Sequence, residues 1–474
     1  MDEKMTTESD KHSYNRFLFI FVLLAGTFTM SISQSSLSTA YPVLMKYFGI
    51  PASTVQWLTT GFMLVMCILM PISPWLLHNV KFNVLFLGTV ALFDIGTLII
   101  ILAPNFPLMM TGRILEAAAV GILFPSFQTV LLTITKDNQR GTTMGIAGLV
   151  MGSALACGPI VSGIVLHSLS WRSLFIVFLI VITCVLILAF FFIKNVMPYH
   201  PSHIDILSVI YSIGIIGILY IINGIGKTGT QWAANFPILA ISLIALVLFV
   251  IRQLRLDTPL LQLRVFKIFH FDCAVILTAS SYIALIVTTI IFPLYYQGIL
   301  GLSPFASGMS LVPAALLLSL LNPLTGKLAD SIGYKRTMEI GMSLIVIGWL
   351  ALTLIAGKMN LPLMIFLSMI IEGGNAFVMM PAVTLGANSL PPQLTADSTA
   401  VITTMRQIFG STGVAVATLI LTNVTAQRIS IGQSEANASI QGYHAIFLTF
   451  LIVEAAALLF SFFMEKDIPD PAKN

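Results

Sequence analysis

A succession of apolar segments of about twenty residues, separated by short polar loops, dominates this sequence. A helix of roughly 20 predominantly apolar residues is long enough to cross the hydrocarbon core of a bilayer. We count about fourteen such segments, and charged residues make up only 9% of the chain. Within lipid, a helix satisfies its own backbone hydrogen bonds, so each segment is predicted to be helical. The sequence therefore predicts an all-α, multi-pass membrane protein.

The predicted spans set the topology of the chain. They cover residues 17–38, 53–75, 84–103, 108–133, 141–167, 171–193, 204–223, 236–251, 272–297, 305–327, 337–357, 361–385, 396–423 and 443–464. An even number of spans places both ends of the chain on one side of the membrane. Most of the 23 lysines and arginines fall on that side. The positive-inside rule therefore predicts a plasma-membrane protein with both termini in the cytoplasm.

Ionisable residues inside the predicted spans mark a candidate site. Arg113 and Glu116 lie three residues apart and would share one face of a helix. A second acid, Glu372, precedes Pro381 by nine residues, as Glu116 precedes Pro125. A charge inside a span is costly and faces a partner or an aqueous cavity rather than lipid. Acids at matching places in the two halves indicate an internal repeat and predict a site where the repeats meet.

The same repeat predicts the domain organisation. Gly49 and Pro71 reappear as Gly301 and Pro323, both at an offset of 252 residues. We therefore expect two six-helix bundles, at residues 16–195 and 272–464, joined by a two-helix insert at 196–256. An amphipathic, basic linker at 257–271 is expected to lie along the cytoplasmic interface, and cytoplasmic tails are expected at 1–15 and 465–474.

The clearest motif lies in the loop after the tenth predicted span. It reads Gly326-Lys-Leu-Ala-Asp330-Ser-Ile-Gly333-Tyr-Lys335-Arg336 and resembles the cytoplasmic loop signature of the major facilitator superfamily. Glycines permit a tight turn between spans. Asp330 can accept hydrogen bonds at a helix end and pair with the basic residues. We expect this loop to latch the cytoplasmic side of the second half.

Other stretches are similar to the fourteen-helix drug:proton antiporters of that superfamily. They are Val55-Gln56-Trp57-Leu58 in the second span, Met405-Arg406-Gln407 in the thirteenth, and a glycine pattern in the fifth. The positions of that pattern that match the antiporter signature are Gly145, Gly158, Pro159 and Gly163. The resemblance covers essentially the whole chain. It implies the major facilitator fold and export of compounds in exchange for protons.

The sequence departs from that family in two places. The corresponding loop of the first half, residues 74–81, lacks the glycines and the aspartate of the signature. The first span has no acid at residues 31–36, where many relatives carry an aspartate. If this protein couples transport to protons, the carrier must lie elsewhere, and Glu116 is the leading candidate.

Candidate roles follow for the buried polar residues. Burial disfavours the ionised form of Glu116 while Arg113 favours it, so the carboxyl could load and release a proton or bind a cation. The alternative is a structural ion pair. Glu372 is either the second cavity acid or a hydrogen-bonding group that holds two helices together, and Asp94 is either a coupling residue or a polar tether between helices. Arg406 either faces the cavity or pairs with an acid. The substrate cavity is predicted to include Gln34, Gln56, Trp57, Asn375, Met379 and Arg406.

The predicted function is proton-coupled efflux of amphiphilic, often cationic, compounds by alternating access, carried out by a monomer. Its partners are then small substrates, protons and membrane lipid, with no nucleic acid, and the proton gradient stands in place of a cofactor. Export of an endogenous metabolite or envelope lipid is one alternative, and a non-transporting membrane receptor is another. We expect neither an enzyme nor a metal site, because the sequence has no phosphate loop, catalytic arrangement or metal-ligand spacing.

Overall fold

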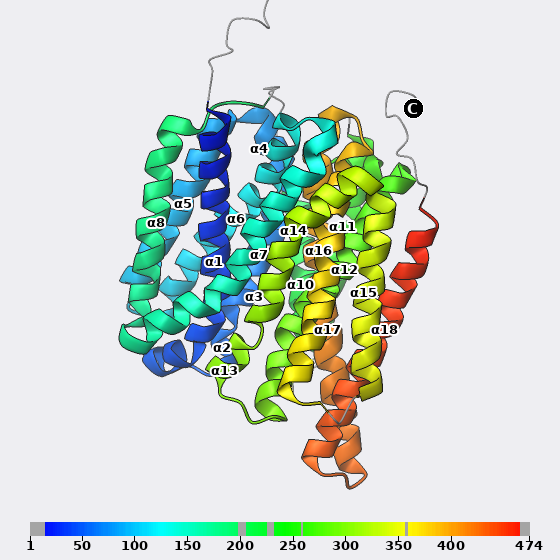
Figure 1. Ribbon diagram of the computed structural model, residues 1–474. Coiled ribbons are helices and arrows are strands. Elements are labelled where there is room, and N and C mark those ends of the chain that lie inside the picture. Colours follow the sequence, from blue (N-terminus) through cyan, green and yellow to red (C-terminus); the bar gives the residue numbers. More distant parts are fainter. Residues whose placement is uncertain (1–14, 198–204, 225–231, 257–258, 356–358, 465–474) are drawn as a thin grey trace, which may run out of the picture.

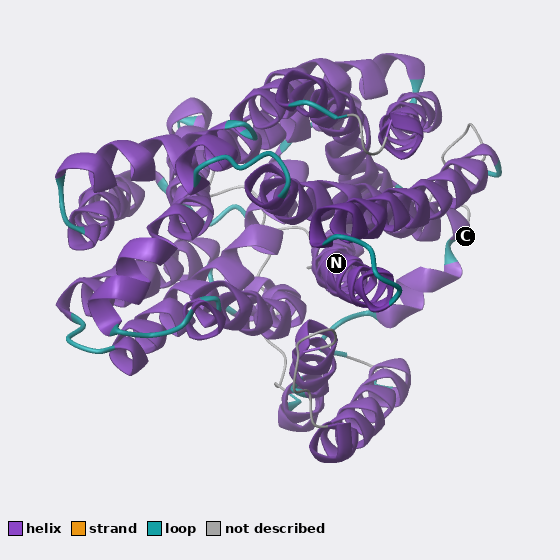
Figure 2. Cartoon of the chain, turned by 90° about the horizontal axis from the view of Figure 1, so that it is seen from below, coloured by secondary structure: helices purple, strands orange, loops and turns teal. Residues whose placement is uncertain are grey.

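The computed structural model describes residues 15–197, 205–224, 232–256, 259–355 and 359–464 (Figure 1). These residues form helices joined by loops and turns, and they contain no strand (Figure 2). They include 13 helices that are long and apolar enough to cross a membrane. The predicted fold class, an all-α membrane protein of two six-helix bundles with an inserted helix pair, is therefore confirmed.

The first bundle consists of six spanning segments. They are α1 (Arg16–Phe48), a segment running from α3 (Trp57–Leu69) through η1 (Met70–Ile72) to α4 (Ser73–Asn79), α5 (Phe82–Leu102), α6 (Phe106–Ile134), α7 (Arg140–Ser168) and α8 (Trp171–Phe192). A short α2 (Ala52–Val55) precedes α3. The second segment tightens into a 3-10 turn at η1, because Pro71 and Pro74 lack the backbone N–H that an α-helix needs.

The second bundle repeats this pattern. Its segments are α12 (Phe269–Gly298), α14 (Val312–Ile332) with α13 (Pro304–Met309) ahead of it, α15 (Tyr334–Ile355), α16 (Leu361–Asn388), α17 (Thr395–Ser430) and α18 (Glu435–Phe462). Asn105 and Asn360 cap α6 and α16 in the same way. Each side-chain oxygen accepts the backbone N–H three residues ahead at 3.0 Å. The internal repeat is therefore visible at the start of the two acid-bearing helices.

The insert differs from the prediction in its first helix. The span predicted at 204–223 is divided into α9 (Ile206–Ser212) and α10 (Gly214–Gly224), and it is absent from the 13 candidate spans of the described residues. The break falls at Ile213, between a serine and a glycine, two residue types with weak helix propensity. α11 (Trp232–Arg255) follows, and its Arg252 forms an ion pair with Asp205 at 2.5 Å. α10 packs against α3 and α17, one helix of each bundle.

The linker after α11 packs its apolar side chains against the helices. Its described part contains η3 (Leu263–Lys267), and its buried apolar side chains are Leu260, Leu261 and Val265. The backbone N–H of Leu261 donates to Gln253 at 3.1 Å, and that of Gln262 donates to Asp397 of α17 at 2.8 Å. The apolar side of this stretch therefore packs on helices, whereas the sequence placed it along the membrane interface. Residues 257 and 258 lie outside the described residues.

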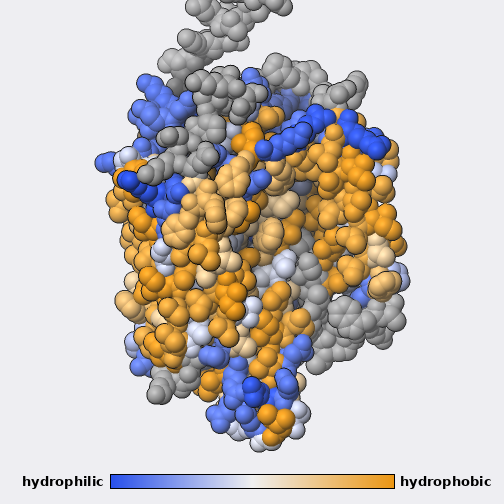
Figure 3. Space-filling view, turned by 90° about the vertical axis from the view of Figure 1, so that its right-hand side faces the viewer, coloured by the Kyte–Doolittle hydropathy of each residue, from blue (hydrophilic) through white to orange (hydrophobic). Residues whose placement is uncertain are grey.

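The first and last helices have their chain ends on the same side of the molecule. α1 begins and α18 ends at the same end of the molecule, which we name the terminal face (Figure 1). On the side of the molecule that Figure 3 shows, a broad hydrophobic band covers the middle, with hydrophilic residues near the terminal face and at the opposite end. The hydrocarbon of a bilayer covers a band of this kind. The predicted tails, 1–15 and 465–474, lie outside the described residues except for Asn15.

Candidate functional site

Glu116 and Arg113 form a buried ion pair on α6. Both residues are fully buried, and Arg113 Nη1 lies 2.5 Å from Glu116 Oε2. The Thr97 hydroxyl of α5 donates to Glu116 Oε1 at 2.7 Å. Arg113 also donates from Nε to the Leu58 carbonyl at 3.4 Å, and its guanidinium carbon lies 4.3 Å from the centroid of the Phe62 ring. The pair therefore ties α6 to α5 and α3, and Glu116 has a fixed cationic partner.

Glu372 on α16 has a different environment. Its exposed fraction is 6%, and two neutral donors hold its carboxylate, Thr288 of α12 at 2.9 Å and Asn375 at 3.0 Å. Asn375 in turn accepts a hydrogen bond from Ser281 of α12 at 2.5 Å. Among the described residues, no lysine, arginine or histidine lies within ion-pair distance of Glu372. The two bundles thus place an acid at matching positions, one paired with a cation and one not.

Asp94 joins two neighbouring helices of the first bundle. It is half-buried on α5, and the Thr183 hydroxyl of α8 donates to its two carboxylate oxygens at 3.0 and 3.1 Å. α5 packs mainly against α6 and α8 of its own bundle. This geometry matches the tether that the sequence left as one of two interpretations of Asp94.

Arg406 of α17 is the second arginine inside a span. Its exposed fraction is 5%, and its guanidinium carbon lies 5.0 Å from the centroid of the Tyr282 ring. The Tyr282 hydroxyl donates to the neighbouring Gln407 at 3.2 Å. Met379 of α16 packs in the same apolar cluster as Tyr282. Three predicted cavity residues, Arg406, Met379 and Asn375, therefore gather around α12.

The first-half residues predicted for the cavity have other surroundings. Gln34 is half-buried on α1, and Gln56 is exposed where α3 begins. The Trp57 ring stacks on Tyr220 of α10, with the ring centroids 5.9 Å apart and the planes inclined by 26°. Trp57 therefore contacts the two-helix insert, a neighbour that could not be expected from the sequence.

Asp330 of α14 joins the two bundles at the terminal face. Its carboxylate accepts hydrogen bonds from the backbone N–H groups of Gly141 at 2.9 Å and Thr142 at 2.7 Å, in the first turn of α7. A Cβ built on Gly326 would lie 2.2 Å from the Gly141 carbonyl oxygen, so only glycine permits this approach. Gly333 ends α14 at a φ of +92°, which favours glycine. The loop motif therefore holds α14 of the second bundle against α7 of the first.

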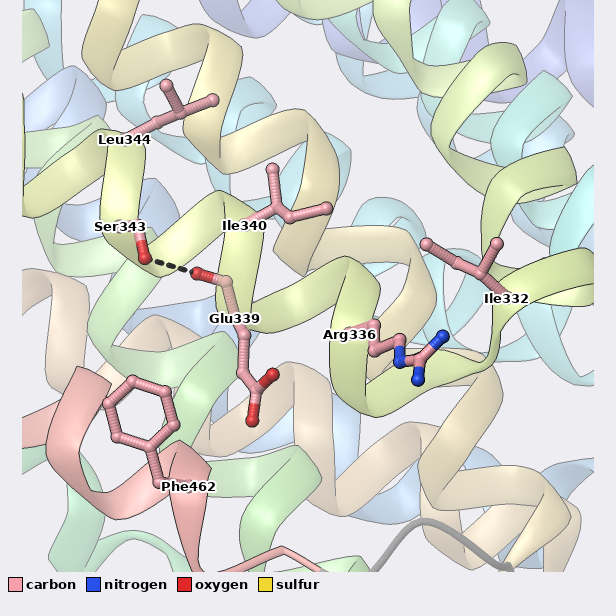
Figure 4. Close-up of a pocket in the computed structure, with 7 residues that line it drawn as sticks. All are labelled: Ile332, Arg336, Glu339, Ile340, Ser343, Leu344 and Phe462. Atoms are coloured by element: carbon pink, nitrogen blue, oxygen red, sulfur yellow. Dashed lines mark hydrogen bonds between the residues drawn. The ribbon is translucent and has the colours of Figure 1, made fainter.

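The two basic residues of this motif have partners other than Asp330. Lys335 Nζ donates to the carbonyl of Phe462, the last residue of α18, at 2.9 Å and to that of Met464, two residues further on. Arg336 is exposed and lines a groove of about 500 Å³, together with Ile332, Glu339, Ile340, Ser343, Leu344 and Phe462 (Figure 4). The expected pairing of Asp330 with these cations does not form among the described residues, because the start of α7 occupies its carboxylate.

α7 carries small residues where it meets its neighbours. A Cβ on Gly145 would lie 2.5 Å from the Asn322 carbonyl oxygen of α14. A Cβ on Gly158 would lie 2.0 Å from a side chain of α1, and one on Gly163 would lie 2.5 Å from a ring of α13. Pro159 lies within α7 beside Gly158. The glycines of the predicted antiporter motif therefore bring α7 into close contact with both bundles.

The neutral partners of the acids were not found from the sequence. Thr97 and Thr288 lie 19 and 84 residues from the carboxylates they contact, and Ser281 lies 94 residues from Asn375. Serine and threonine are common in spans, so no local pattern distinguishes those that reach an acid. The packing of α5 on α6 and of α12 on α16 brings these groups together.

Two six-helix bundles, related by an internal repeat and meeting through small residues and buried polar groups, define a membrane transporter built from two repeats. The chain belongs to the Major Facilitator Superfamily, which its sequence matches over residues 23–414.

Two relatives match nearly the whole chain. The MFS-type transporter YcnB of Bacillus subtilis (strain 168) is 35% identical over 463 residues, covering 98% of each chain. The lincomycin resistance protein LmrB of Listeria monocytogenes is 36% identical over 451 residues, covering 94% of this chain and 95% of the relative. The solved structure of the proton:xylose symporter XylE has the same fold, with a TM-score of 0.64 at 12% identity over 92% of this chain and 94% of XylE. This family consists of transporters rather than enzymes.

Proposed function

We propose that this chain is a proton-coupled exporter of amphiphilic, often cationic, compounds in the cell membrane, with both termini in the cytoplasm. Support comes from its membership of a transporter family, from a relative named for lincomycin resistance, and from the acids buried inside its spans. On this proposal the terminal face is the cytoplasmic side, as the distribution of lysine and arginine favours.

The difference between the two buried acids carries the proposal. Protonation of Glu116 would remove the anionic partner of Arg113 and leave a buried guanidinium without compensation. Glu372 is held by neutral donors, so its carboxyl can exchange a proton for a cationic ligand without that cost. We therefore place proton exchange at Glu372 first. Glu116, the leading candidate from the sequence, is assigned mainly to fixing α6 in its bundle.

The transport cycle then follows from rocking of one bundle against the other. With the terminal face open, a cationic compound from the cytoplasm binds at Glu372 and displaces its proton to that side. With the terminal face closed by Asp330 on α7, a proton from outside neutralises Glu372 and the compound leaves. Each cycle moves protons inward down their gradient and cargo outward.

The test is efflux of ethidium, a fluorescent cation, from cells that contain wild type, Glu372→Gln or Glu116→Gln at matched levels in the membrane. Each strain is assayed with the proton gradient intact and with the gradient collapsed by a protonophore. We expect wild type to extrude ethidium only with the gradient intact. We expect the efflux rate of Glu372→Gln to be about tenfold or more below that of wild type. A tenfold change corresponds to a free-energy difference of about 1.4 kcal/mol.

Glu116→Gln supplies the matched comparison, because it removes the same charge from the other bundle. It is expected to keep gradient-dependent efflux in the fraction of protein that folds. Ethidium efflux that is independent of the proton gradient would contradict proton coupling. Full efflux activity of Glu372→Gln would show that a carboxylate other than Glu372 couples transport to protons. Accumulation of lincomycin, measured in the same strains, extends the test to the compound for which the relative is named.

A further inference from the structure

Arg406 is a buried cation, and two of its three guanidinium nitrogens donate no hydrogen bond to the described residues. Its exposed fraction is 5%, and neither Nε nor Nη1 has a hydrogen-bond partner among the described residues. The face of the Tyr282 ring, 5.0 Å from the guanidinium carbon, is its nearest charge-stabilising neighbour. Arg113 shows the contrast, because its guanidinium is paired with Glu116 in the same hydrophobic interior.

The acids of the second bundle do not neutralise Arg406. Glu372 is engaged by Thr288 and Asn375, and Glu454 of α18 accepts a hydrogen bond from Ser280 at 2.6 Å. Neither carboxylate forms an ion pair with Arg406 among the described residues. An arginine keeps its charge in proteins, and a buried charge persists where a partner compensates it. The compensating anion for Arg406 must therefore come from outside the described residues.

The position of Arg406 suits a group that travels with the cargo. Arg406 lies 11 residues into α17, or about 16 Å along the helix axis, within a segment that is long and apolar enough to cross a membrane. α17 also packs on the first bundle, where Thr399 shares a hydrogen bond of 2.5 Å with Thr129 of α6. A site on such a helix changes its surroundings when the two bundles move. α12 places Tyr282 against Arg406 and the adjacent Ser281 in the Asn375–Glu372 network.

We propose that Arg406, on the face of Tyr282, binds the carboxylate of the exported compound, so that the cargo includes zwitterionic amphiphiles as well as cations. This inference rests on the proposed export function and specifies its substrate class. A zwitterion would set its cationic group toward Glu372 and its carboxylate on Arg406, two residues that contact α12 and form no ion pair among the described residues. Guanidinium groups bind carboxylates through paired, charge-assisted hydrogen bonds, and this makes the site selective for that group.

A pair of dyes that differ only at the carboxyl group provides the probe. Rhodamine 110 carries a free carboxylate and is zwitterionic, whereas rhodamine 123 is its cationic methyl ester. Binding of each dye to the purified full-length protein is measured by fluorescence anisotropy in wild type, Arg406→Gln and Arg406→Lys. Arg428→Gln is the control, because Arg428 is an exposed arginine near the other end of the same helix.

We expect wild type to bind rhodamine 110 more tightly than rhodamine 123. Arg406→Gln should lower the affinity for rhodamine 110 about tenfold or more and change the affinity for rhodamine 123 less than about twofold. Arg406→Lys should keep an intermediate preference for rhodamine 110, and Arg428→Gln should leave the affinity for both dyes unchanged. Each variant is first checked for a single elution peak and an unchanged Tm. If Arg406→Gln does not fold, the preference of wild type and of Arg406→Lys for the acid decides the question.

Equal binding of the two dyes by wild type, or no binding of rhodamine 110, would overturn the inference. An equal loss of affinity for both dyes in Arg406→Gln would also overturn it and leave Arg406 as a structural residue. The outcome is separate from that of the export proposal, because binding to purified protein needs no proton gradient. Gradient-independent ethidium efflux would remove proton coupling while leaving the difference between acid and ester intact.

Discussion

Asp330 accepts both the backbone N–H and the side-chain hydroxyl of Thr142, each at 2.7 Å, across the boundary between the two bundles. The start of α7 carries the partial positive charge of the helix dipole, so a carboxylate is favoured there. Gly326 lets the α14 backbone approach α7 closely enough for this contact. A single carboxylate of the second bundle thus caps a helix of the first at the terminal face.

We predict that Asp330→Asn loosens this contact. An amide lacks the charge that favours the α7 N-terminus and cannot accept all the hydrogen bonds of the carboxylate, so the closed arrangement should lose about 1–3 kcal/mol. Hydrogen exchange at residues 140–145 should speed up in the purified protein. Asp137→Asn is the control, because Asp137 is 84% exposed and only pairs with Arg140 at the surface. Unchanged exchange in Asp330→Asn would show that other contacts hold the terminal face shut.

We predict that Gly326→Ala impairs transport while leaving the bundles folded. The added methyl group would lie 2.2 Å from the Gly141 carbonyl oxygen, and backbone atoms cannot move aside as a side chain can. The terminal face should then fail to close, and ethidium efflux should fall while the Tm changes little. Gly88→Ala is the matched control, since a Cβ built on Gly88 of α5 meets nothing within 4 Å. Normal efflux in Gly326→Ala would mean that closure does not need this approach.

Arg113 and Glu116 should show strong coupling in a double-mutant cycle. Replacing either residue alone by methionine leaves a buried charge without its partner, at a cost of about 3–5 kcal/mol. Replacing both removes the two charges together, so the double variant should have a higher Tm than either single variant. Losses of Tm that simply add would indicate that the two residues act independently, against the 2.5 Å contact between them.

We predict that Asp94→Asn retains gradient-dependent efflux. The Thr183 hydroxyl can still donate to the amide oxygen, so the link between α5 and α8 survives the loss of charge. Ethidium efflux should remain within about twofold of wild type and should still stop when the gradient is collapsed. Loss of the gradient requirement in a folded Asp94→Asn protein would make Asp94 a coupling residue.

Much of the fold was predictable because it depends on local properties of the chain. The length and apolarity of a segment decide whether it spans a bilayer, and 13 of the predicted spans appear among the described helices. The exception, α9 and α10, shows the limit of that rule. Its mean apolarity resembles that of a span, yet the helix breaks beside Gly214. The spacing of Glu116 and Glu372 from their prolines likewise revealed the repeat without any structure.

The surroundings of the candidate site could be predicted only in part. The sequence identified Arg113 and Glu116 as neighbours, because residues three apart share one face of a helix. The contact of Thr288 with Glu372 and the position of Arg406 over Tyr282 could not be predicted from the sequence. Those contacts depend on how each helix is rotated about its axis and on which helix lies beside it, and apolar spans leave both open.

The sequence alone determined that this protein is a helical membrane transporter with an internal repeat, a loop motif and two acids at matching positions. Those features follow from hydropathy, length and spacing along one chain. Tertiary structure decided that Asp330 caps α7 rather than pairing with Lys335 or Arg336. It also decided that, within the part of the chain that the structure describes, Glu116 has a cationic partner and Glu372 has none. Such pairings join residues far apart in the chain, so the packing of the helices selects them.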